Sequence, residues 1–335
     1  MTIILSESDV RDLVDMPLAI KAVTIAFRSI GAGDGRNVPR ERLFPPTSSG
    51  VATSLQVMAA TVPELDAMGL KAYGTGASGA NFVVLLFRAS TGELRGVVGA
   101  DWLGRFRTGA ATGVAARFLA RPNSRVVAIL GAGGQAVTQA LAVLTAMADV
   151  REMRVWNRSE ERSRAFRDRL ASVDERRVGD RIERGLSIVP VETPFGAMDG
   201  ADIVVAITSA RTPVLEGTWV RDGMHITGAG INRANVAEID ATAIARADLV
   251  VVDHIESARR EAGDLILASN SGCFEWSRVV ELGSVVSGVH PGRTSDAEVT
   301  LFESQGIAAE DVALASLLLD RAEARSHGRH YSFAD

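Results

Sequence analysis

Cysteine, aromatic residues and long apolar runs are scarce in this sequence of 335 residues, which has a single cysteine and 5% aromatic residues. One cysteine excludes a disulfide within the chain and is typical of a reducing compartment. No stretch approaches the roughly 18 apolar residues that span a bilayer, and the N-terminal residues do not resemble a signal or transit peptide. We therefore expect a cytoplasmic protein, with Cys273 buried beside Phe274 and Trp276.

The sequence also lacks an excess of basic residues, since its formal net charge is -5. This excludes nucleic acid and an acidic membrane surface as expected partners. No metal site is expected, because the spacing of the histidines does not match a set of metal ligands; they are His225, His254, His290, His327 and His330. No Ser/His/Asp arrangement or nucleophile elbow is present either. The length predicts about two domains.

The first 120 residues predict a lobe that contains both helices and a sheet. A short strand and a helix capped by Ser6 or Ser8 fill residues 1–30. Too few residues separate the next strands for crossover helices, so their sheet is antiparallel or mixed; they are residues 51–60, 69–74, 81–88 and 94–99. A helix over 108–119 then ends at Arg121-Pro122-Asn123, which marks a domain boundary.

From Ser124 onward, apolar runs alternate with helical patterns, which predicts a parallel, doubly wound sheet. The predicted strands are VVAIL, RVW, LSIVPV, DIVVAIT, MHITGAG and DLVVVD. We assign residues 121–299 to this domain and expect the charged segment 174–184 to be a solvated loop. Residues 300–335, with a helix from about Glu310 to Arg325, return to the first lobe. That lobe therefore comprises residues 1–120 and 300–335.

The turn after VVAIL matches the dinucleotide-binding pattern G-x-G-x-x-A. The first glycine permits the tight turn, the second lets a pyrophosphate approach the backbone, and the alanine allows close packing of helix on strand. The pyrophosphate then lies at a helix N-terminus, where free N–H groups favour anions. The turn follows an apolar strand and opens a helix, so we predict a Rossmann-type domain with a nicotinamide dinucleotide on Gly131, Gly133, Gly134, Gln135 and Ala136.

The end of the second strand bears on the choice of cofactor. NAD-binding sites have Asp or Glu there for the ribose hydroxyls, whereas this chain has Asn157-Arg158-Ser159. Because Arg158 would attract a 2′-phosphate, we favour NADP(H) over NAD(H). The alternatives are that Arg158 points into solvent and that Glu160 binds the ribose. The ends of two later strands also predict cofactor contacts, at Thr208, Ser209 and Gly230.

Several segments, in order along nearly the whole chain, resemble the ornithine cyclodeaminase/mu-crystallin family. The R-T-G-A-A element at 107–111, ahead of G-A-G-G-Q-A at 131–136, is more specific than either piece alone. The other matching segments are 38–42, 69–71, 103–106, 201–204 with Thr208 and Pro213, 228–240, 288–293, and Gly306 with Asp311. The resemblance implies a homodimer built through the substrate-binding and dimerisation lobe, with the active site between the lobes.

The resemblance also implies a substrate site. Arg42, Lys71 and Arg107 match the basic residues that hold the substrate carboxylate in the family, and an Arg fork fits a planar carboxylate. Thr108 follows and is expected to touch the cofactor. Lys71, partly desolvated among arginines, would have a lowered pKa and could exchange a proton with an imine or amine. Read without the family, each of these residues is a surface cation.

Two positions depart from the cyclodeaminase pattern. Members that release ammonia use acidic residues to handle the substrate amines, and the aligned positions here are the amides Gln56 and Asn232. An amide can hydrogen-bond but cannot act as a general base. The alternative for Asn232 is a turn residue after a strand.

We therefore predict an NAD(P)H-dependent imine reductase or amino-acid dehydrogenase that transfers hydride at the α-carbon of a small α-imino or α-amino acid. Arg42 and Arg107 would hold the carboxylate, Lys71 would handle the proton, and Asn232 and Gln56 would contact the nitrogen. One alternative is an ornithine or lysine cyclodeaminase that recycles its NAD. The other is a non-catalytic ligand-binding protein like mu-crystallin.

Overall fold

The computed structural model describes residues 1–46, 53–77 and 79–333, and its contacts divide the chain into two compact units. Unit 1 comprises Met1–Arg107 and Gly306–Asp335, and unit 2 comprises Thr108–Gln305. The C-terminal segment from Gly306 onward thus belongs to unit 1. The first division lies inside helix α3 (Asp101–Leu119) rather than after residue 120, because the second half of α3 packs on the next helix: a Cβ at Gly109 would lie 2.4 Å from the Thr138 carbonyl oxygen.

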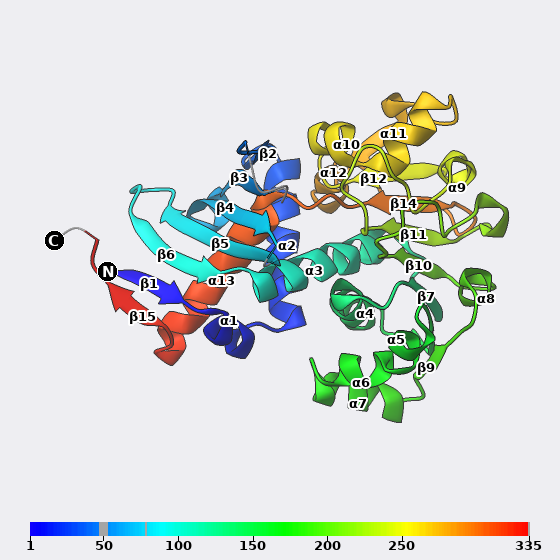
Figure 1. Ribbon diagram of the computed structural model, residues 1–335, viewed down its shortest axis with the longest axis horizontal. Helices are drawn as coiled ribbons and strands as arrows, with labels where there is room; N and C mark the ends of the chain where they lie inside the picture. Colours follow the sequence, from blue (N-terminus) through cyan, green and yellow to red (C-terminus); the bar gives the residue numbers. More distant parts are fainter. Residues whose placement is uncertain (47–52, 78, 334–335) are drawn as a thin grey trace. The chain divides into compact units, whose positions relative to one another are not determined.

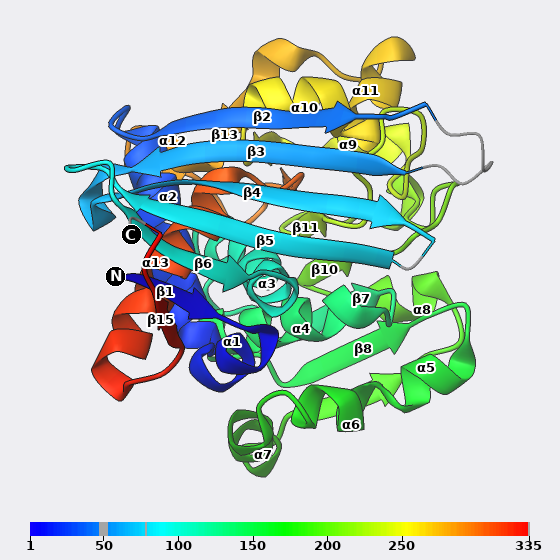
Figure 2. The same cartoon turned by 60° about the vertical axis from the view of Figure 1, so that its left-hand side comes forward.

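Unit 1 is built on a seven-stranded sheet, sheet A, in the order β15-β1-β6-β5-β4-β3-β2. Strands β2 to β6 pair antiparallel in sequence order, and β1 pairs parallel with β6. The predicted mixed sheet is confirmed, although residues 51 and 52 lie outside the described residues. The bounds are β1 Thr2–Leu5, β2 Arg36–Leu43, β3 Ser54–Val62, β4 Ala67–Gly76, β5 Gly79–Arg88, β6 Leu94–Gly99 and β15 Arg329–Tyr331. Figure 2 shows β2 to β5 side by side.

Side chains cap the first two helices of unit 1. Ser6 caps α1 by accepting a hydrogen bond from the Asp9 backbone, and Asp15 caps α2 by accepting from Leu18. The helices of this unit are α1 Glu7–Leu13, α2 Met16–Gly31, the single turn η1 Pro63–Leu65, and α13 Ala308–Arg325. Helix α13 packs along β3, β4 and β5 and against α2 (Figure 1). Its burial brings two acidic residues, Glu310 and Asp311, under sheet A.

Unit 2 is built on an eight-stranded sheet, sheet B, in which all neighbouring strands pair parallel, in the order β13-β12-β14-β11-β10-β7-β8-β9. The predicted doubly wound sheet is confirmed. The bounds are β7 Val126–Leu130, β8 Glu152–Trp156, β9 Ser187–Pro190, β10 Ile203–Ala206, β11 His225–Gly228, β12 Leu249–Val252, β13 Val279–Glu281 and β14 Thr300–Glu303. Strand β14 lies inside sheet B, whereas we expected residues from 300 onward in the first lobe.

Helices flank the strands of unit 2, and two local expectations were wrong. Residues 175–183 form a helix, not a loop, because Asp174 caps it by accepting from Arg177; and Cys273 is exposed, not buried. The helices are α4 Gly134–Ala146, α5 Glu160–Arg164, α6 Phe166–Ala171, α7 Glu175–Glu183, α8 Pro194–Met198, α9 Ala241–Arg246, α10 Ile255–Glu261, α11 Gly263–Asn270 and α12 Leu282–Val286, with single turns η2 Gly217–Trp219 and η3 Trp276–Arg278.

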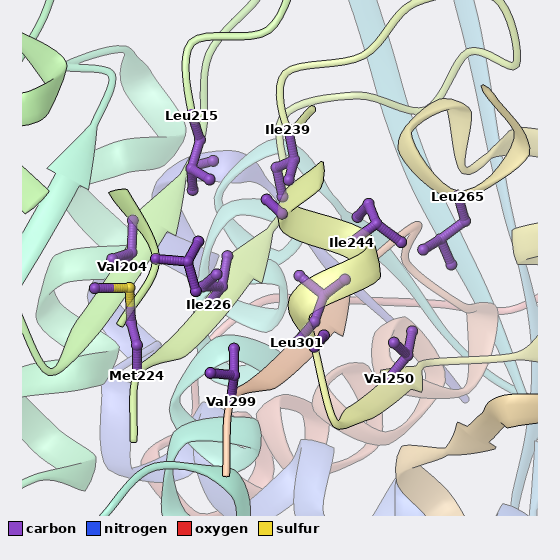
Figure 3. Close-up of a cluster of buried hydrophobic side chains, with 14 of the residues drawn as sticks. Val204, Leu215, Met224, Ile226, Ile239, Ile244, Val250, Leu265, Val299 and Leu301 are labelled. Atoms are coloured by element: carbon purple, nitrogen blue, oxygen red, sulfur yellow. The ribbon is translucent and has the colours of Figure 1, made fainter. Parts of the chain in front are cut away.

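The core of unit 2 explains why its strands are apolar on both faces. Alternate residues of β10, β11, β12 and β14 point into one cluster with residues from α9 and α11 (Figure 3), and the intervening strand residues are buried on the other face. Strands β7 and β10 are neighbours, while the chain leaves β7 toward β8 on the opposite side. Such a switch point is where doubly wound sheets bind ligands, at the carboxyl ends of the strands.

Among the described residues, no helix is long and apolar enough to cross a membrane.

Candidate active site

Cross-strand register places several predicted substrate residues on the face of sheet A that α13 covers. Arg42 pairs with Gln56 and Gln56 with Tyr73, so these three side chains form one row across β2, β3 and β4. Met58 and Lys71 form the next row on the same face, because side chains two residues apart share a face. Gln56 Oε1 accepts from Tyr73 Oη at 2.6 Å and from Arg42 Nε at 3.3 Å.

Lys71 is buried and its ammonium is tightly surrounded. Its Nζ lies 2.7 Å from Asp311 Oδ1, and both side chains are at most 4% exposed. The Phe82 ring lies below the ammonium, with 5.3 Å between Nζ and the ring centroid. A Cβ at Gly104 would come within 3.1 Å of Nζ, so the absence of a side chain on this turn of α3 makes room for the ammonium.

Arg107 meets the same acidic pair from α3. Its Nη1 lies 3.1 Å from Glu310 Oε2, and its Nε lies 3.3 Å from Asp311 Oδ1. Gly306 lies directly beside the guanidinium: a Cβ there would be 2.2 Å from Arg107 Nη1, and the φ of +76° is one that residues with side chains rarely adopt. Lys71 and Arg107 thus share Asp311 as a counter-ion.

Burial and the neighbouring charges shift the pKa values of Lys71 and Asp311 in this cluster. Burial lowers the pKa of the Lys71 amine, and Asp311 opposes that effect while Arg107 and Arg40 reinforce it. Burial alone would raise the pKa of the Asp311 carboxyl, but Arg107, Lys71 and Arg40 together hold it below its ordinary value. Asp311 is therefore ionised, and Lys71 gives up a proton more readily than a lysine in water.

The glycine turn of unit 2 fits a dinucleotide. Gly131 has φ +116°, and a Cβ there would lie 2.4 Å from the Ile207 carbonyl oxygen, so only glycine fits. At Gly133 a Cβ would meet nothing within 4 Å, which leaves the backbone open to a ligand. No side chain caps the first turn of α4. A cavity of about 420 Å³ lies beside the glycine turn and is also lined by residues of α5, by Ala165 and by Arg169 of α6. Free N–H groups beside such a space suit a pyrophosphate.

Two side chains that follow β8 in the sequence hold the glycine turn in place. Asn157 Oδ1 accepts a hydrogen bond from the Ala132 backbone at 3.1 Å. Arg169 donates to the carbonyl oxygens of Ala132 and Gly133 at 2.6 and 2.9 Å. Arg158 is exposed, and within the described part of the chain its guanidinium has no ion pair or hydrogen bond. Glu160 pairs with Arg164 at 2.5 Å.

The carboxyl ends of β10 and β11 are tied together by a residue that the sequence did not single out. Glu238, 0% exposed, accepts from Thr208 and from Gly230. Ser209 directly follows Thr208, Asn232 lies two residues after Gly230, and both are exposed.

The Thr108 carbonyl oxygen accepts from Gln139 Nε2 at 3.3 Å. No group of three or more His, Cys, Asp or Glu side chains that could hold a metal ion occurs in the described ranges.

The structure brings together two sets of the predicted residues. In unit 1 these are Lys71 with Arg107, through Asp311, and Arg42 with Gln56. In unit 2 they are Thr208 with Gly230, through Glu238, and Asn157 with the glycine turn. The residues whose place in the site the sequence analysis did not predict are Glu310, Asp311, Tyr73, Phe82 and Glu238, although Asp311 is among the positions that match the family. Adjacent acids in the otherwise apolar helix sequence A-A-E-D-V-A-L-A could have indicated the first two, since buried carboxylates need partners.

Comparison with known proteins decides the family. The profile of the ornithine cyclodeaminase/mu-crystallin family matches residues 1–326. The chain belongs to this family. A Delta(1)-pyrroline-2-carboxylate reductase of Bacillus cereus is 33% identical over 99% of this chain and 100% of its own length.

Solved structures agree with the sequence match. The Thermococcus litoralis Delta(1)-pyrroline-2-carboxylate reductase, in complex with NADH and L-proline, has a TM-score of 0.88 at 28% identity and covers 98% of this chain and 100% of its own. An archaeal alanine dehydrogenase dimer with bound NAD has a TM-score of 0.86 at 29% identity and covers 99% of both chains. These relatives bind a nicotinamide dinucleotide, which matches the turn described in unit 2.

Proposed function

We propose that this protein reduces a small α-imino acid with a nicotinamide dinucleotide, or oxidises the corresponding amino acid in reverse. It is an NAD(P)-dependent oxidoreductase acting on carbon–nitrogen bonds. The observation that carries the proposal is the buried Lys71–Asp311–Arg107 cluster in a chain that also has the dinucleotide turn. The relatives named above, which act on or bind such compounds, support the substrate class.

The charge of the cluster supports an anionic substrate. Arg40, Lys71 and Arg107 are each at most 8% exposed, and the two buried acids Glu310 and Asp311 belong to the same cluster of charged groups. When all five groups are charged, one positive charge remains, and a single carboxylate would balance it. Arg107, with Arg42 from the neighbouring row, would hold this carboxylate through the guanidinium fork.

Lys71 would supply the proton that accompanies reduction. Reduction of C=N adds a hydride to carbon and a proton to nitrogen, and the bound nicotinamide supplies the hydride. A buried ammonium whose pKa is lowered donates its proton more readily than one in water, and Asp311 keeps enough charge beside it for the protonated form to persist. In the oxidative direction the neutral amine takes the proton back.

The amide side chains would orient the nitrogen. Asn232 follows β11 in unit 2, and Gln56 is held by Arg42 and Tyr73 in unit 1. Neither can pair with an ammonium as a carboxylate does, so they favour imine reduction over loss of ammonia. This assignment supports imine reduction over the cyclodeaminase alternative.

We propose NADP(H) as the preferred cofactor. The residue that follows β8 and Asn157 is Arg158, with no carboxylate at the position where NAD-binding sites place one, and Glu160 is engaged by Arg164. An exposed guanidinium there attracts a 2′-phosphate. Gly131, Gly133, Gly134, Gln135 and Ala136 would hold the pyrophosphate, with Thr108, Thr208, Ser209 and Gly230 as further contacts.

We also propose a homodimer formed through sheet A. Strand β2 is an edge strand, and large apolar side chains are exposed on it and around it: Val38, Leu43, Phe44 and Leu55 are 52%, 60%, 69% and 44% exposed. An edge strand with apolar neighbours invites pairing with another chain. The dimeric alanine dehydrogenase relative supports this proposal.

The test is oxidation of NADPH and of NADH with a panel of cyclic and acyclic α-imino acids. Wild-type protein and Lys21→Met, whose lysine is exposed in the same unit, should turn over at the same rate. Lys71→Met should lose about 100- to 10,000-fold in kcat, the usual value of a positioned acid. Turnover that survives in Lys71→Met refutes the role of Lys71. Ammonia released from ornithine or lysine without net change in nicotinamide absorbance would instead establish a cyclodeaminase.

A further inference from the structure

The feature that the proposed reaction leaves unexplained is the buried carboxylate of Glu238. Its Oε2 accepts from Thr208 N at 2.8 Å and from Thr208 Oγ1 at 2.9 Å, and its Oε1 accepts from Gly230 N at 2.7 Å. No lysine or arginine of the described ranges forms an ion pair with it. A buried carboxylate held only by hydrogen-bond donors is costly, so its position calls for a reason.

The three hydrogen bonds to Glu238 connect the segments that follow β10 and β11, beyond the last residues that pair in the sheet. Strands β10 and β11 pair in register up to Ala206 and Gly228. Thr208 and Gly230 each lie two residues further on, where the carboxylate bridges them. The two segments approach closely, since a Cβ at Gly230 would lie 2.3 Å from the Thr208 carbonyl oxygen and 2.6 Å from both Glu238 oxygens.

Glu238 is itself held rigidly. Asp264 Oδ1 accepts from the backbone N–H groups of Glu238 and Ile239 at 2.8 and 2.7 Å. The Glu238 carbonyl oxygen accepts from Val214 at 2.8 Å. The residues that follow the two acids, Ile239 and Leu265, both point into the apolar core of unit 2 (Figure 3). The carboxylate is thus fixed to the core and not to a loop.

We propose that Glu238 is a positioning residue that fixes the ends of β10 and β11 where the nicotinamide half of the cofactor binds. This rests on the proposed use of a nicotinamide dinucleotide. The carboxyl ends of parallel strands are the ligand-binding edge of such a sheet, and Asn232 lies only two residues beyond Gly230. By holding Thr208 and Gly230 together, Glu238 fixes the backbone that carries Ser209 and Asn232.

Opposing effects act on the Glu238 carboxyl. Burial and then Asp264 raise its pKa, the hydrogen bonds from Thr208 and Gly230 lower it, and together they leave the pKa raised to about 7. The acids that face it are Asp264 from α11 and Glu303 from β14, and both have raised pKa values for the same reason. The three donors oppose the rise in the pKa of Glu238, because the ionised carboxylate accepts all three bonds without a competing proton.

The test separates the two halves of the cofactor. ADP-ribose carries the adenosine and pyrophosphate but no nicotinamide, so it binds the glycine turn without reaching the bridged strand ends. In Glu238→Gln the amide keeps the size of the side chain but turns a donor toward the Gly230 N–H. We expect the Kd for ADP-ribose to stay within about twofold and the Kd for NADH to rise about tenfold, with kcat falling about 100-fold, as a misplacement near the reacting atoms produces.

Two further variants keep the result interpretable. Glu192→Gln changes an exposed glutamate of the same unit and should leave both Kd values unchanged. Glu238→Asp keeps the charge but is too short to reach both strand ends, and it should also weaken NADH selectively. Equal weakening of both ligands, or of neither, overturns the proposal. Because the test measures binding, the positioning role of Glu238 can be tested even if no imine is turned over. Wild-type protein that binds neither NADH nor ADP-ribose would overturn both the proposed cofactor and the positioning role.

Discussion

Replacement of Asp311 by asparagine removes the shared counter-ion of Lys71 and Arg107 while keeping the size of the side chain. The lysine ammonium is 2.7 Å and the arginine Nε 3.3 Å from the same carboxylate oxygen. Without the charge, two buried cations lose the counter-ion that they share, and Arg107 keeps its ion pair with Glu310. Asp311→Asn therefore tests whether the cluster is held by charge or by packing.

The magnitude follows from the geometry. At an effective dielectric constant of about 20, unit charges 2.7 Å apart attract by about 6 kcal/mol. Desolvation offsets part of this, and breaking one side of a buried pair usually costs about 3–5 kcal/mol. The net stability of a folded protein is only about 5–15 kcal/mol, so the variant should be markedly less stable. Asp311 also raises the pKa of Lys71, so its loss lowers that pKa further.

Two assays read these effects. The free energy of unfolding in urea should fall by about 3–5 kcal/mol, and the fall of activity at high pH, where Lys71 loses its proton, should begin at lower pH. The matched control is Asp320→Asn on the same helix, whose carboxylate is 56% exposed beside Arg95 and is worth at most about 1 kcal/mol. An Asp311→Asn variant with wild-type stability and pH profile would refute the reasoning.

Three more outcomes follow from single sites. Burial lowers the pKa of His225 to about 3, so the unfolded state alone takes up this proton below about pH 6.5; stability should fall as the pH drops from there, by up to about 5 kcal/mol, and urea unfolding of His225→Gln at pH 7 and 4.5 should show a smaller fall. Arg158→Ala should lower the ratio of kcat/KM for NADPH to that for NADH by about tenfold, and an unchanged ratio argues against the 2′-phosphate contact. Gly306→Ala forces a side chain into a φ of +76° beside Arg107; it should cost about 1–2 kcal/mol in thermal unfolding, and activity should fall with it.

Much of the fold could be predicted because its signals are local. The apolar runs at 126–130, 203–206 and 225–228 are buried on both faces, and such strands belong to parallel sheets. The G-x-G-x-x-A turn needs glycine at 131 for a reason that the backbone geometry bears out. Strand β2 was missed because R-N-V-P-R-E-R-L is polar and contains a proline, and β14 was misplaced because its partners, β11 and β12, are far away in the sequence.

The candidate site was predicted only in part, for a related reason. The cations Lys71 and Arg107 stood out through their family motifs, but their counter-ion Asp311 lies 240 residues from Lys71. Nothing in local periodicity joins these positions, because the contact is made by packing α13 on sheet A. Glu238 was missed in the same way, since its role depends on where two strands end and not on its neighbours in the sequence.

Reduction of a cyclic imine is the most direct measurement. Wild-type protein should oxidise NADPH when given Δ1-pyrroline-2-carboxylate or another member of the α-imino acid panel, and Lys71→Met should not, although it binds the cofactor as wild type does. If wild-type protein binds the cofactor but oxidises none with any α-imino acid of the panel, the proposed reaction is wrong.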